Sequence, residues 1–365
     1  MGMDELDPIE AAVEAIRRGE MIIVVDDDDR ENEGDLIMAA VTATPEQVAF
    51  MVRHTSGILC TPVTSADAAR LRLTPMVSVN DAPLQTAFTV SVDYRFGLTT
   101  GISAEERTST IRALANRNIG AEDFVRPGHI FPLVARDGGV LVRSGHTEAA
   151  VDLCRLAGVE TVGVLAELVN DDGTVKRLPA CREFAAAHGL RIVAIADLIE
   201  YRQRRDQLVR RVSVFETPTP IGPATAIVYA TPFDPVQHVA MVFGDLGTGE
   251  RVLARIHREQ PLADVLGGGA GGATRALARI GREKRGVFLL LRDAVVAQPS
   301  ADSADEEGHE SAQRRMRQWR DVGIGAQILR DLGVVSIHLL AAHRRHYIGL
   351  SGFGIEIAET ELLDC

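Results

Sequence analysis

The sequence predicts two α/β domains, each with a mixed β-sheet between two layers of helices (three-layer α-β-α). Short apolar runs of strand type alternate with amphipathic stretches of helical period along both halves of the chain. The length of 365 residues favours two domains, and a hydrophobic fraction of 46% supplies two ordinary cores. A polar, basic stretch at 201–207 interrupts the alternation. We therefore expect one domain at 1–205 and a second at 206–365.

In the first half, the apolar spacing and the helix-start signals define the expected elements. Thr44-Pro45-Glu46 offers an N-cap followed by proline, and Ser103 with Glu106 forms a capping box. The expected helices cover residues 8–18, 44 onward, 103–115, 146–157, 179–188 and 197 onward. The expected strands are the apolar runs at 21–25, 35–41, 88–92, 130–135, 159–168 and 191–195.

The second half shows more strand character. Its expected strands lie at 211–215, 224–230, 236–243, 251–256, 287–291 and 334–339. Helices are expected at 273–282 and over a long stretch that ends near residue 331. Between residues 298 and 311 the composition of Ser, Asp, Glu, Ala and Gly predicts a disordered surface loop.

Charge and cysteine content argue against several classes of function. A net charge of −12 argues against a nucleic-acid-binding protein, which needs a basic surface to meet phosphates. The acidic N-terminus is unlike a signal peptide, and no apolar run has the length of a membrane span. We therefore expect a cytoplasmic protein. Neither a disulfide framework nor a zinc knuckle is indicated, because the cysteines are far apart and form no C-x-x-C: Cys60, Cys154, Cys181 and Cys365.

Residues 26–35, D-D-D-D-R-E-N-E-G-D, place seven carboxylates directly after the apolar run at 21–25. A charge run of this kind is most often a solvated loop. A calcium loop is excluded, because the best frame begins at Asp29 and has Ala40 where a bidentate Glu is needed. A catalytic site for a hard cation is the third interpretation. Crowded carboxylates stay charged only beside a cation, and otherwise some of them bind protons.

A second stretch, R-S-G-H-T-E-A at 143–149, reads as a glycine turn that opens a helix. It is either a helix start with an incidental histidine or an anion site, since free N–H groups at a helix start attract anions. Arg143 and Thr147 would add a guanidinium and a hydroxyl to bind phosphate. His146 and a carboxylate of the acidic stretch could together hold Mg²⁺, and the imidazole also suits Mn²⁺. Such a cation would stabilise an enediolate while other carboxylates transfer protons.

Five blocks in this order resemble the 3,4-dihydroxy-2-butanone 4-phosphate synthase family over roughly residues 5–205. The resemblance implies conversion of ribulose 5-phosphate to the butanone phosphate and formate, in riboflavin biosynthesis, by a homodimer. The blocks are R-E-N-E-G-D-L-I in the acidic stretch, H-T-S-G-I-L-C at 54–60, T-T-G-I-S-A-E-E-R at 99–107, P-G-H-I-F-P-L at 127–133 and R-S-G-H-T-E-A.

The resemblance also implies roles for individual residues. Glu31 and His146 match the magnesium ligands of the family. Two departures, Asp28 for a frequent Glu and Ser144 for a frequent Arg, touch no matched role. Residues matched to substrate binding are Arg30, Glu31, Asp35, Arg143, Gly145, His146, Thr147 and Glu167. Residues matched to catalysis are Asp26, Glu33, Cys60, His129 and Glu167.

The second half contains a glycine run, 267–272, that satisfies G-x-G-x-x-G. A dinucleotide site is one interpretation, but the preceding residues 260–266 contain a proline and no clear buried strand. Residues 212–365 instead resemble GTP cyclohydrolase II, most clearly at 323–333 and also at Pro218-Thr219, 255–257 and 352–356.

The three zinc cysteines of the cyclohydrolase family are absent from this sequence. Their positions read Gln260, Gly271 and Ala273, so a thiolate zinc site cannot form. We expect a second domain that folds, holds no zinc and does not open GTP. The alternatives are a bifunctional enzyme that also opens GTP and a nucleotide-binding or regulatory protein that acts through this domain.

Overall fold

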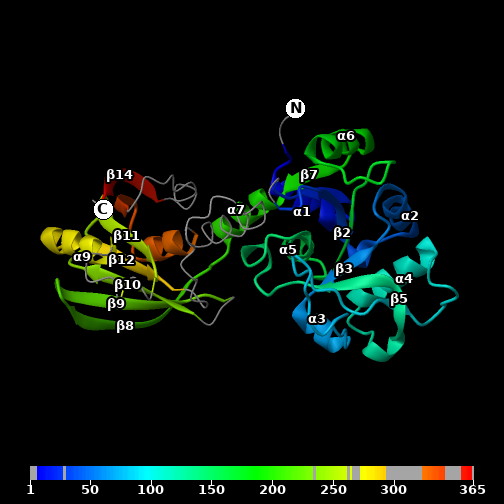
Figure 1. Ribbon diagram of the computed structural model, residues 1–365, viewed down its shortest axis with the longest axis horizontal. Helices are drawn as coiled ribbons and strands as arrows, with labels where there is room; N and C mark the ends of the chain where they lie inside the picture. The colour runs from blue at the N-terminus through cyan, green and yellow to red at the C-terminus, as the bar shows by residue number, and fades with distance from the viewer. Residues whose placement is uncertain are drawn as a thin grey trace. The chain divides into compact units, whose positions relative to one another are not determined.

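The computed structural model describes residues 6–27, 30–232, 236–260, 264, 272–292, 323–341 and 355–363. The chain divides into two compact units, Met1–Tyr201 and Arg202–Cys365 (Figure 1). The expected domain boundary lies after residue 205, at the end of helix α7 (Ile195–Arg205). This helix runs across the division between residues 201 and 202, so the exact boundary remains a prediction. The expected loop at 298–311 and the glycines at 267–271 lie outside the described residues.

The first unit contains a seven-stranded sheet in the order β4-β5-β3-β6-β2-β1-β7. It is mixed, as predicted: β1 runs parallel to β7 and β3 parallel to β5, whereas β2 is antiparallel to both β1 and β6. The strands are β1 (Ile22–Val25), β2 (Gly34–Ala39), β3 (Cys60–Val63), β4 (Val92–Tyr94), β5 (Phe124–Val134), β6 (Gly163–Glu167) and β7 (Arg191–Ala194).

Helices cover both faces of this sheet. Successive side chains of β2 point to opposite faces, and each face packs against its own layer of helices. Leu36 and Met38 join a core with α2, α3, α4 and α6, so Asp35 and Ile37 face the layer of α1 and α5. Figure 1 shows α5 and α2 on opposite sides of β2 and β3. The helices are α1 (Ile9–Arg17), α2 (Pro45–His54), α3 (Ser65–Arg70), α4 (Ala104–Ala115), α5 (His146–Ala157) and α6 (Leu178–His188).

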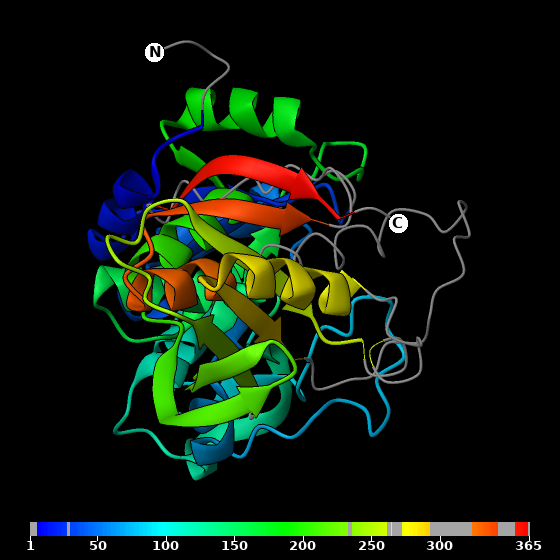
Figure 2. The same cartoon turned by 90° about the vertical axis from the view of Figure 1, so that its left-hand side faces the viewer.

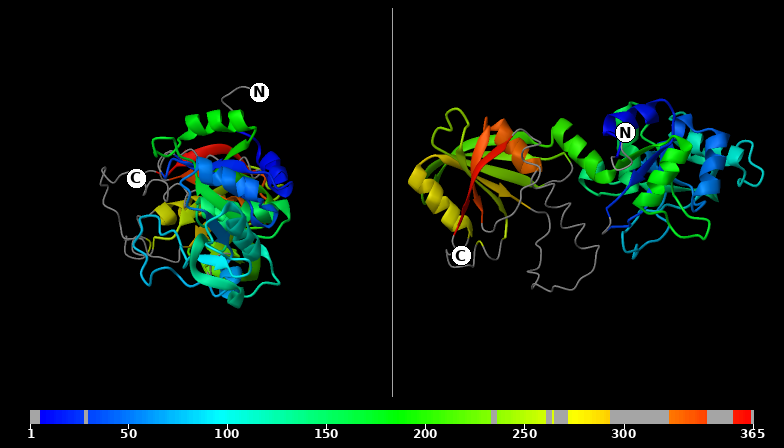
Figure 3. Two further views of the ribbon diagram at one scale, coloured as in Figure 1. Left: turned by 90° about the vertical axis from the view of Figure 1, so that its right-hand side faces the viewer. Right: turned by 90° about the horizontal axis from the view of Figure 1, so that it is seen from above.

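The second unit is also a seven-stranded mixed sheet, in the order β14-β13-β11-β12-β10-β9-β8. Helix α9 (Gly272–Glu283) packs on one face, and the helix at 323–331 packs on the other (Figure 3, right). Figure 2 shows β14 in red beside β13. The strands are β8 (Arg210–Thr219), β9 (Gly222–Ala230), β10 (Gln237–Phe243), β11 (Val252–Arg258), β12 (Gly286–Leu291), β13 (Ser336–Ala341) and β14 (Glu356–Leu362).

The three-layer α/β class is confirmed in both units, but some elements differ from the prediction. The strand expected at 88–92 is wrong, because Phe88 and Thr89 form only isolated bridges and β4 begins at Val92. The prediction missed β3, α3 and β14. β3 is a four-residue strand that includes Pro62, and β14 is an edge strand with mostly exposed residues, so neither has a strong periodic pattern. No helix among the described residues is long and apolar enough to cross a membrane.

Candidate active site

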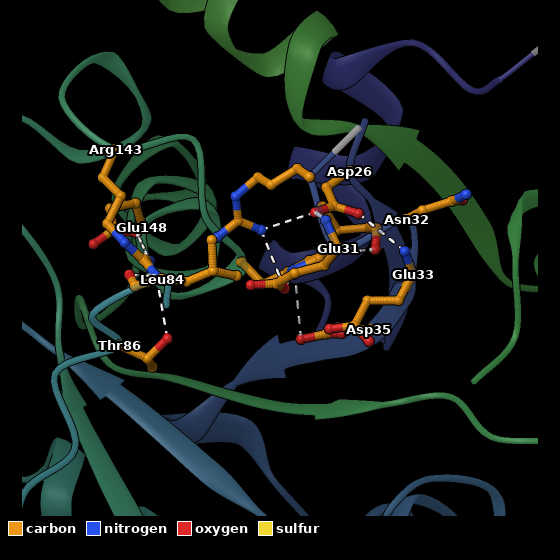
Figure 4. A network of polar contacts seen from close by, with 12 residues as sticks. Asp26, Glu31, Asn32, Glu33, Asp35, Leu84, Thr86, Arg143 and Glu148 are labelled. Atoms are coloured by element: carbon orange, nitrogen blue, oxygen red, sulfur yellow. Dashed lines mark hydrogen bonds and ion pairs between the residues drawn. The ribbon is translucent and has the colours of Figure 1, made fainter. Parts of the chain in front are cut away.

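The acidic loop joins the antiparallel strands β1 and β2, and the carboxylate of Asp26 organises it. Asp26 accepts hydrogen bonds from the backbone N–H of Glu31 at 3.0 Å, the N–H of Glu33 at 3.0 Å and the guanidinium of Arg30 at 2.8 Å. Arg177 of the loop before α6 donates to the carbonyl of Glu31 at 2.6 Å. The predicted catalytic residue Asp26 therefore shapes the loop so that the side chains of Glu31 and Glu33 lie together over β2 (Figure 4).

The concentrated negative charge is balanced by two cationic groups. Arg30, whose side chain is only 8% exposed, also contacts the Glu31 carboxylate at 3.1 Å. His146, the first residue of α5, places Nδ1 3.5 Å from the Glu31 carboxylate and 3.9 Å from that of Asp35. The structure thus brings the predicted metal ligands Glu31 and His146 together, although they lie 115 positions apart (146 − 31) in the chain.

The orientation of the His146 ring follows from a contact on its far side. Nε2 lies 3.2 Å from the backbone carbonyl of Val24 in β1, and only an N–H can bond to a carbonyl there. In its neutral form the imidazole would therefore keep its proton on Nε2 and direct the Nδ1 lone pair toward the carboxylates, whereas in its protonated form Nδ1 donates to them. A backbone carbonyl behind a histidine is the usual arrangement for a histidine that binds a metal.

Burial and mutual repulsion change the acidities in this cluster. Burial, reinforced by neighbouring carboxylates, raises the pKa of Glu33 to about 8 and that of Asp35 to about 7. Burial also opposes the charged forms of Glu31 and His146, but their attraction outweighs it. The hydrogen bond with His146 and the charge of Arg30 hold the pKa of Glu31 well below its usual range. Asp35 and Glu31 raise the pKa of His146 to about 9.

Two overlapping groups of side chains could hold a cation. Asp26, Glu31 and His146 form one group, and Glu33, Asp35 and His146 form the other, each with ligand atoms within 4.8 Å of one another. Carboxylate oxygens with one imidazole nitrogen suit Mg²⁺ or Mn²⁺, which prefer oxygen ligands and accept a histidine. The donor set therefore fits the predicted cofactor.

Glu167 and Cys60 extend the site along the sheet. Glu167 at the end of β6 pairs with Asp35 of β2, and Cys60 of β3 pairs with Leu165 two residues earlier, so all three side chains share one face. Ser56 donates a hydrogen bond from Oγ to the Glu167 carboxylate at 2.6 Å. Burial, together with Glu167 and Asp35, raises the pKa of the Cys60 thiol, which is therefore protonated at neutral pH.

Arg143 lies to one side of the acidic cluster, beside the start of α5 (Figure 4). Its NH1 is 2.7 Å from the Glu148 carboxylate, and its NH2 donates to the Leu84 carbonyl and the Thr86 hydroxyl, each at 3.2 Å. Gly145, the N-cap of α5, has no side chain that could cap the helix, and Thr147 is buried in the first turn. The first N–H groups of α5 thus have no side-chain cap, which favours an anion there.

His129 is a predicted catalytic residue that the structure does not bring into the acidic cluster. It lies on β5, three strands away from β2, which corresponds to roughly 14 Å at the usual strand spacing. Its Nδ1 is 2.7 Å from one carboxylate oxygen of Asp93, and its backbone N–H donates to the other at 2.8 Å. Within one chain His129 therefore belongs to a separate pair with Asp93.

Some residues whose side chains contact the side chains of predicted site residues were absent from the sequence prediction, among them Ser56, Thr86, Asp93 and Glu148. Ser56 and Glu148 lie inside the blocks at 54–60 and 143–149, so their position in those blocks was an available signal. Thr86 and Asp93 lie in no such block, and only the folded chain places them beside Arg143 and His129.

The fold and the site define an α/β protein with a buried, carboxylate-rich site of the kind that binds a divalent cation. The family model for 3,4-dihydroxy-2-butanone 4-phosphate synthase matches residues 10–201, and that for GTP cyclohydrolase II matches residues 210–361. The chain belongs to the 3,4-dihydroxy-2-butanone 4-phosphate synthase family, with a GTP cyclohydrolase II domain behind the synthase domain.

Two similar proteins from Arabidopsis thaliana carry different descriptions. One is the bifunctional riboflavin biosynthesis protein RIBA 1, chloroplastic, 46% identical over 96% of this chain and 67% of that protein. The other is the monofunctional riboflavin biosynthesis protein RIBA 2, chloroplastic, 46% identical over 97% of this chain and 76% of that protein. Overall identity therefore does not distinguish a relative described as bifunctional from one described as monofunctional.

Two solved structures are similar to this chain. RibBX from A. baumannii, a two-domain 3,4-dihydroxy-2-butanone 4-phosphate synthase, has a TM-score of 0.82 at 36% identity and covers 98% of this chain and 100% of that one. A 3,4-dihydroxy-2-butanone 4-phosphate synthase in complex with two magnesium ions has a TM-score of 0.54 at 43% identity. It covers 55% of this chain and 98% of that one.

The acidities of the cluster predict that magnesium binding strengthens as the pH rises. The pKa values are about 7 for Asp35, about 8 for Glu33 and about 9 for His146. Below its pKa each group holds a proton, and a cation must displace that proton in order to bind. The Mg²⁺ affinity should rise from about pH 6 to about pH 9, by roughly tenfold per pH unit for each proton displaced. Isothermal titration calorimetry in buffers of different ionisation enthalpy would count the released protons. A pH-independent affinity without proton release would contradict this prediction.

Proposed function

We propose that this protein converts D-ribulose 5-phosphate to L-3,4-dihydroxy-2-butanone 4-phosphate and formate in riboflavin biosynthesis. The observation that carries the proposal is the cluster of Glu31, Glu33 and Asp35 around Nδ1 of His146. The family of the chain and its two-domain relative RibBX support the same activity.

The two ends of the substrate would meet different parts of the site. Glu31 and His146 would hold Mg²⁺ or Mn²⁺, which supplies a Lewis acid that stabilises an enediolate. The neighbour solved with two magnesium ions supports the choice of metal. Arg143, Thr147 and the first N–H groups of α5, beginning beside Gly145, would bind the phosphate. Separating the phosphate from the carboxylates limits their electrostatic repulsion.

The remaining residues would carry the proton transfers. Removal of the C1 proton, loss of the C3 hydroxyl, the skeletal shift and departure of C4 as formate each involve a proton transfer or a developing oxyanion. Glu33 and Asp35 suit this chemistry because their pKa values of about 8 and 7 lie near neutral pH. Glu167, oriented by Ser56, lies on the same face, and the protonated thiol of Cys60 borders it. Arg30 would neutralise Glu31 and contact the substrate.

The second domain is proposed to be inactive toward GTP and to hold no zinc. A tetrahedral zinc site of this family needs three thiolates, and between residues 182 and 364 the sequence has no cysteine. Gln260 and Ala273 occupy two of the three positions. A relative described as monofunctional is compatible with a single active domain, whereas the bifunctional relative favours the alternative that the domain opens GTP. Nucleotide binding by this domain would favour the regulatory alternative.

The protein is further proposed to act as a homodimer in which His129 serves the site of the partner. The estimated separation of roughly 14 Å supports this, because an imidazole in the same chain cannot reach Asp35 across three strand spacings. Asp93 would hold the His129 ring in position from its own chain.

Formate release from ribulose 5-phosphate tests the synthase activity. We expect magnesium-dependent formate that is abolished by a chelator and reduced roughly 100-fold or more in Glu31→Ala and His146→Ala, because each removes a ligand. His188→Ala, which alters an exposed histidine at the end of α6, is the matched control and should retain activity. No formate under any metal would exclude the synthase activity, and formate from GTP would exclude an inactive second domain.

Mixing two inactive variants tests the role of His129. If His129 acts across a homodimer, random mixing of Glu31→Ala and His129→Ala chains leaves one intact site in half of the dimers. About a quarter of the wild-type activity should then return. Mixing Glu31→Ala with Asp35→Ala should restore nothing, because both residues belong to one chain's site. Absence of recovery in the first mixture, with mixed dimers demonstrated by two affinity tags, would show that His129 does not act in trans.

A further inference from the structure

Glu148, in the first turn of α5, is a buried carboxylate outside the predicted set of site residues. Glu148 is only 1% exposed to solvent. One oxygen is 2.7 Å from NH1 of Arg143, and the other accepts the backbone N–H of Arg136 at 2.9 Å. Both oxygens of the carboxylate therefore have partners, and the charge faces the guanidinium of Arg143.

Gly145 provides the space that this ion pair needs. A Cβ at position 145 would come within 2.2 Å of Arg143 NH1 and 2.7 Å of the Glu148 carboxylate. Its backbone lies in the extended region, so the close approach and not an unusual φ requires glycine there. The glycine of the R-S-G-H-T-E-A block thus allows Arg143 to fold back against the first turn of α5.

The other side of the Arg143 guanidinium is fixed by the segment at 84–86. NH2 donates to the Leu84 carbonyl and the Thr86 hydroxyl, each at 3.2 Å (Figure 4). A planar guanidinium that is bound at NH1 and at NH2 by different segments has a defined position and orientation.

We propose that Glu148 is a positioning residue, which holds the guanidinium of Arg143 at the phosphate end of the site with Thr86 as a second anchor. The inference rests on the proposed function, in which Arg143 contacts the phosphate of ribulose 5-phosphate. Glu148 acts through Arg143 and does not itself touch the substrate. Its loss leaves the guanidinium held only by neutral oxygen atoms at 84 and 86, and phosphate binding weakens.

Asp152, one turn further along α5, offers a matched control. It is fully buried, accepts the backbone N–H of Val140 at 2.8 Å and pairs with Arg155 at 3.0 Å. Like Glu148, it ties the loop before α5 to the helix through one backbone N–H and one arginine. Its arginine lies on the helix itself, so substitution of Asp152 tests the structural effect of losing such a contact.

The experiment measures steady-state kinetics of the full-length chain with ribulose 5-phosphate, and inhibition by inorganic phosphate, for Glu148→Gln, Asp152→Asn and Arg143→Ala. Glu148→Gln should raise KM and the phosphate inhibition constant about tenfold while kcat changes less than about twofold. Asp152→Asn should lower the melting temperature without raising KM. Arg143→Ala combined with Glu148→Gln should show the KM of Arg143→Ala alone, because the two residues act as one unit.

Thr86→Val provides a second test if Glu148→Gln does not fold, and it should raise KM by a smaller factor. An unchanged KM in Glu148→Gln would overturn the inference, and if that variant does not fold, an unchanged KM in Thr86→Val would do so. The proposed function would still stand in that case, provided that the wild-type chain releases formate. Equal KM increases in Glu148→Gln and Asp152→Asn would also overturn it, since a general loosening of α5 would then explain both. A wild-type chain without formate release would instead refute the proposed function itself.

Discussion

The site depends on how the electrostatic repulsion among seven carboxylates, which follow directly after a buried strand, is compensated. Such a cluster is stable only if cations, protons or hydrogen-bond donors compensate it. All three occur: Arg30 and His146 supply positive charge, Glu33 and Asp35 have raised pKa values, and the backbone N–H groups of the loop bind Asp26. A divalent cation would replace the protons, so the electrostatic repulsion that shapes the loop would also favour binding of a metal.

Helix α5 connects the two halves of the proposed chemistry. Its first residue, His146, reaches the carboxylates over β2, while Glu148 in the same turn holds Arg143. The helix packs against β1, β2 and β3, and the bond from His146 to the Val24 carbonyl links its N-terminus to β1. In the proposed function, one helix turn would therefore link the cation end to the phosphate end, because His146 and Glu148 are two residues apart in α5 and Glu148 contacts Arg143 of the preceding loop.

The fold of the second unit and the zinc chemistry of its family depend on different residues. Its sheet retains an apolar core on both faces, with Ala276 and Ile280 of α9 on one side and Ala326 and Leu329 of the helix at 323–331 on the other. A core of this kind depends on apolar volume and alternation, whereas a zinc site depends on three particular thiolates. Under the proposed function, the absence of cysteines at 260, 271 and 273 would remove the zinc site and leave in place the residues that build the sheet.

The sequence by itself determined the local elements and the pairing of chemical groups. It defined the bounds of α5 at 146–157 and the capping of α4 by Ser103, and the resemblance to the family implied the association of Glu31 with His146. These depend on periodicity, helix capping and recognisable residue blocks, which are properties of neighbouring residues. Strands β3 and β14 escaped prediction because pairing with distant strands, and not a local pattern, makes them strands. Only the tertiary structure placed Glu148 and Thr86 on Arg143. It also put His129 three strands from Asp35. The reason is that strand order and burial arise from contacts between segments far apart in the chain.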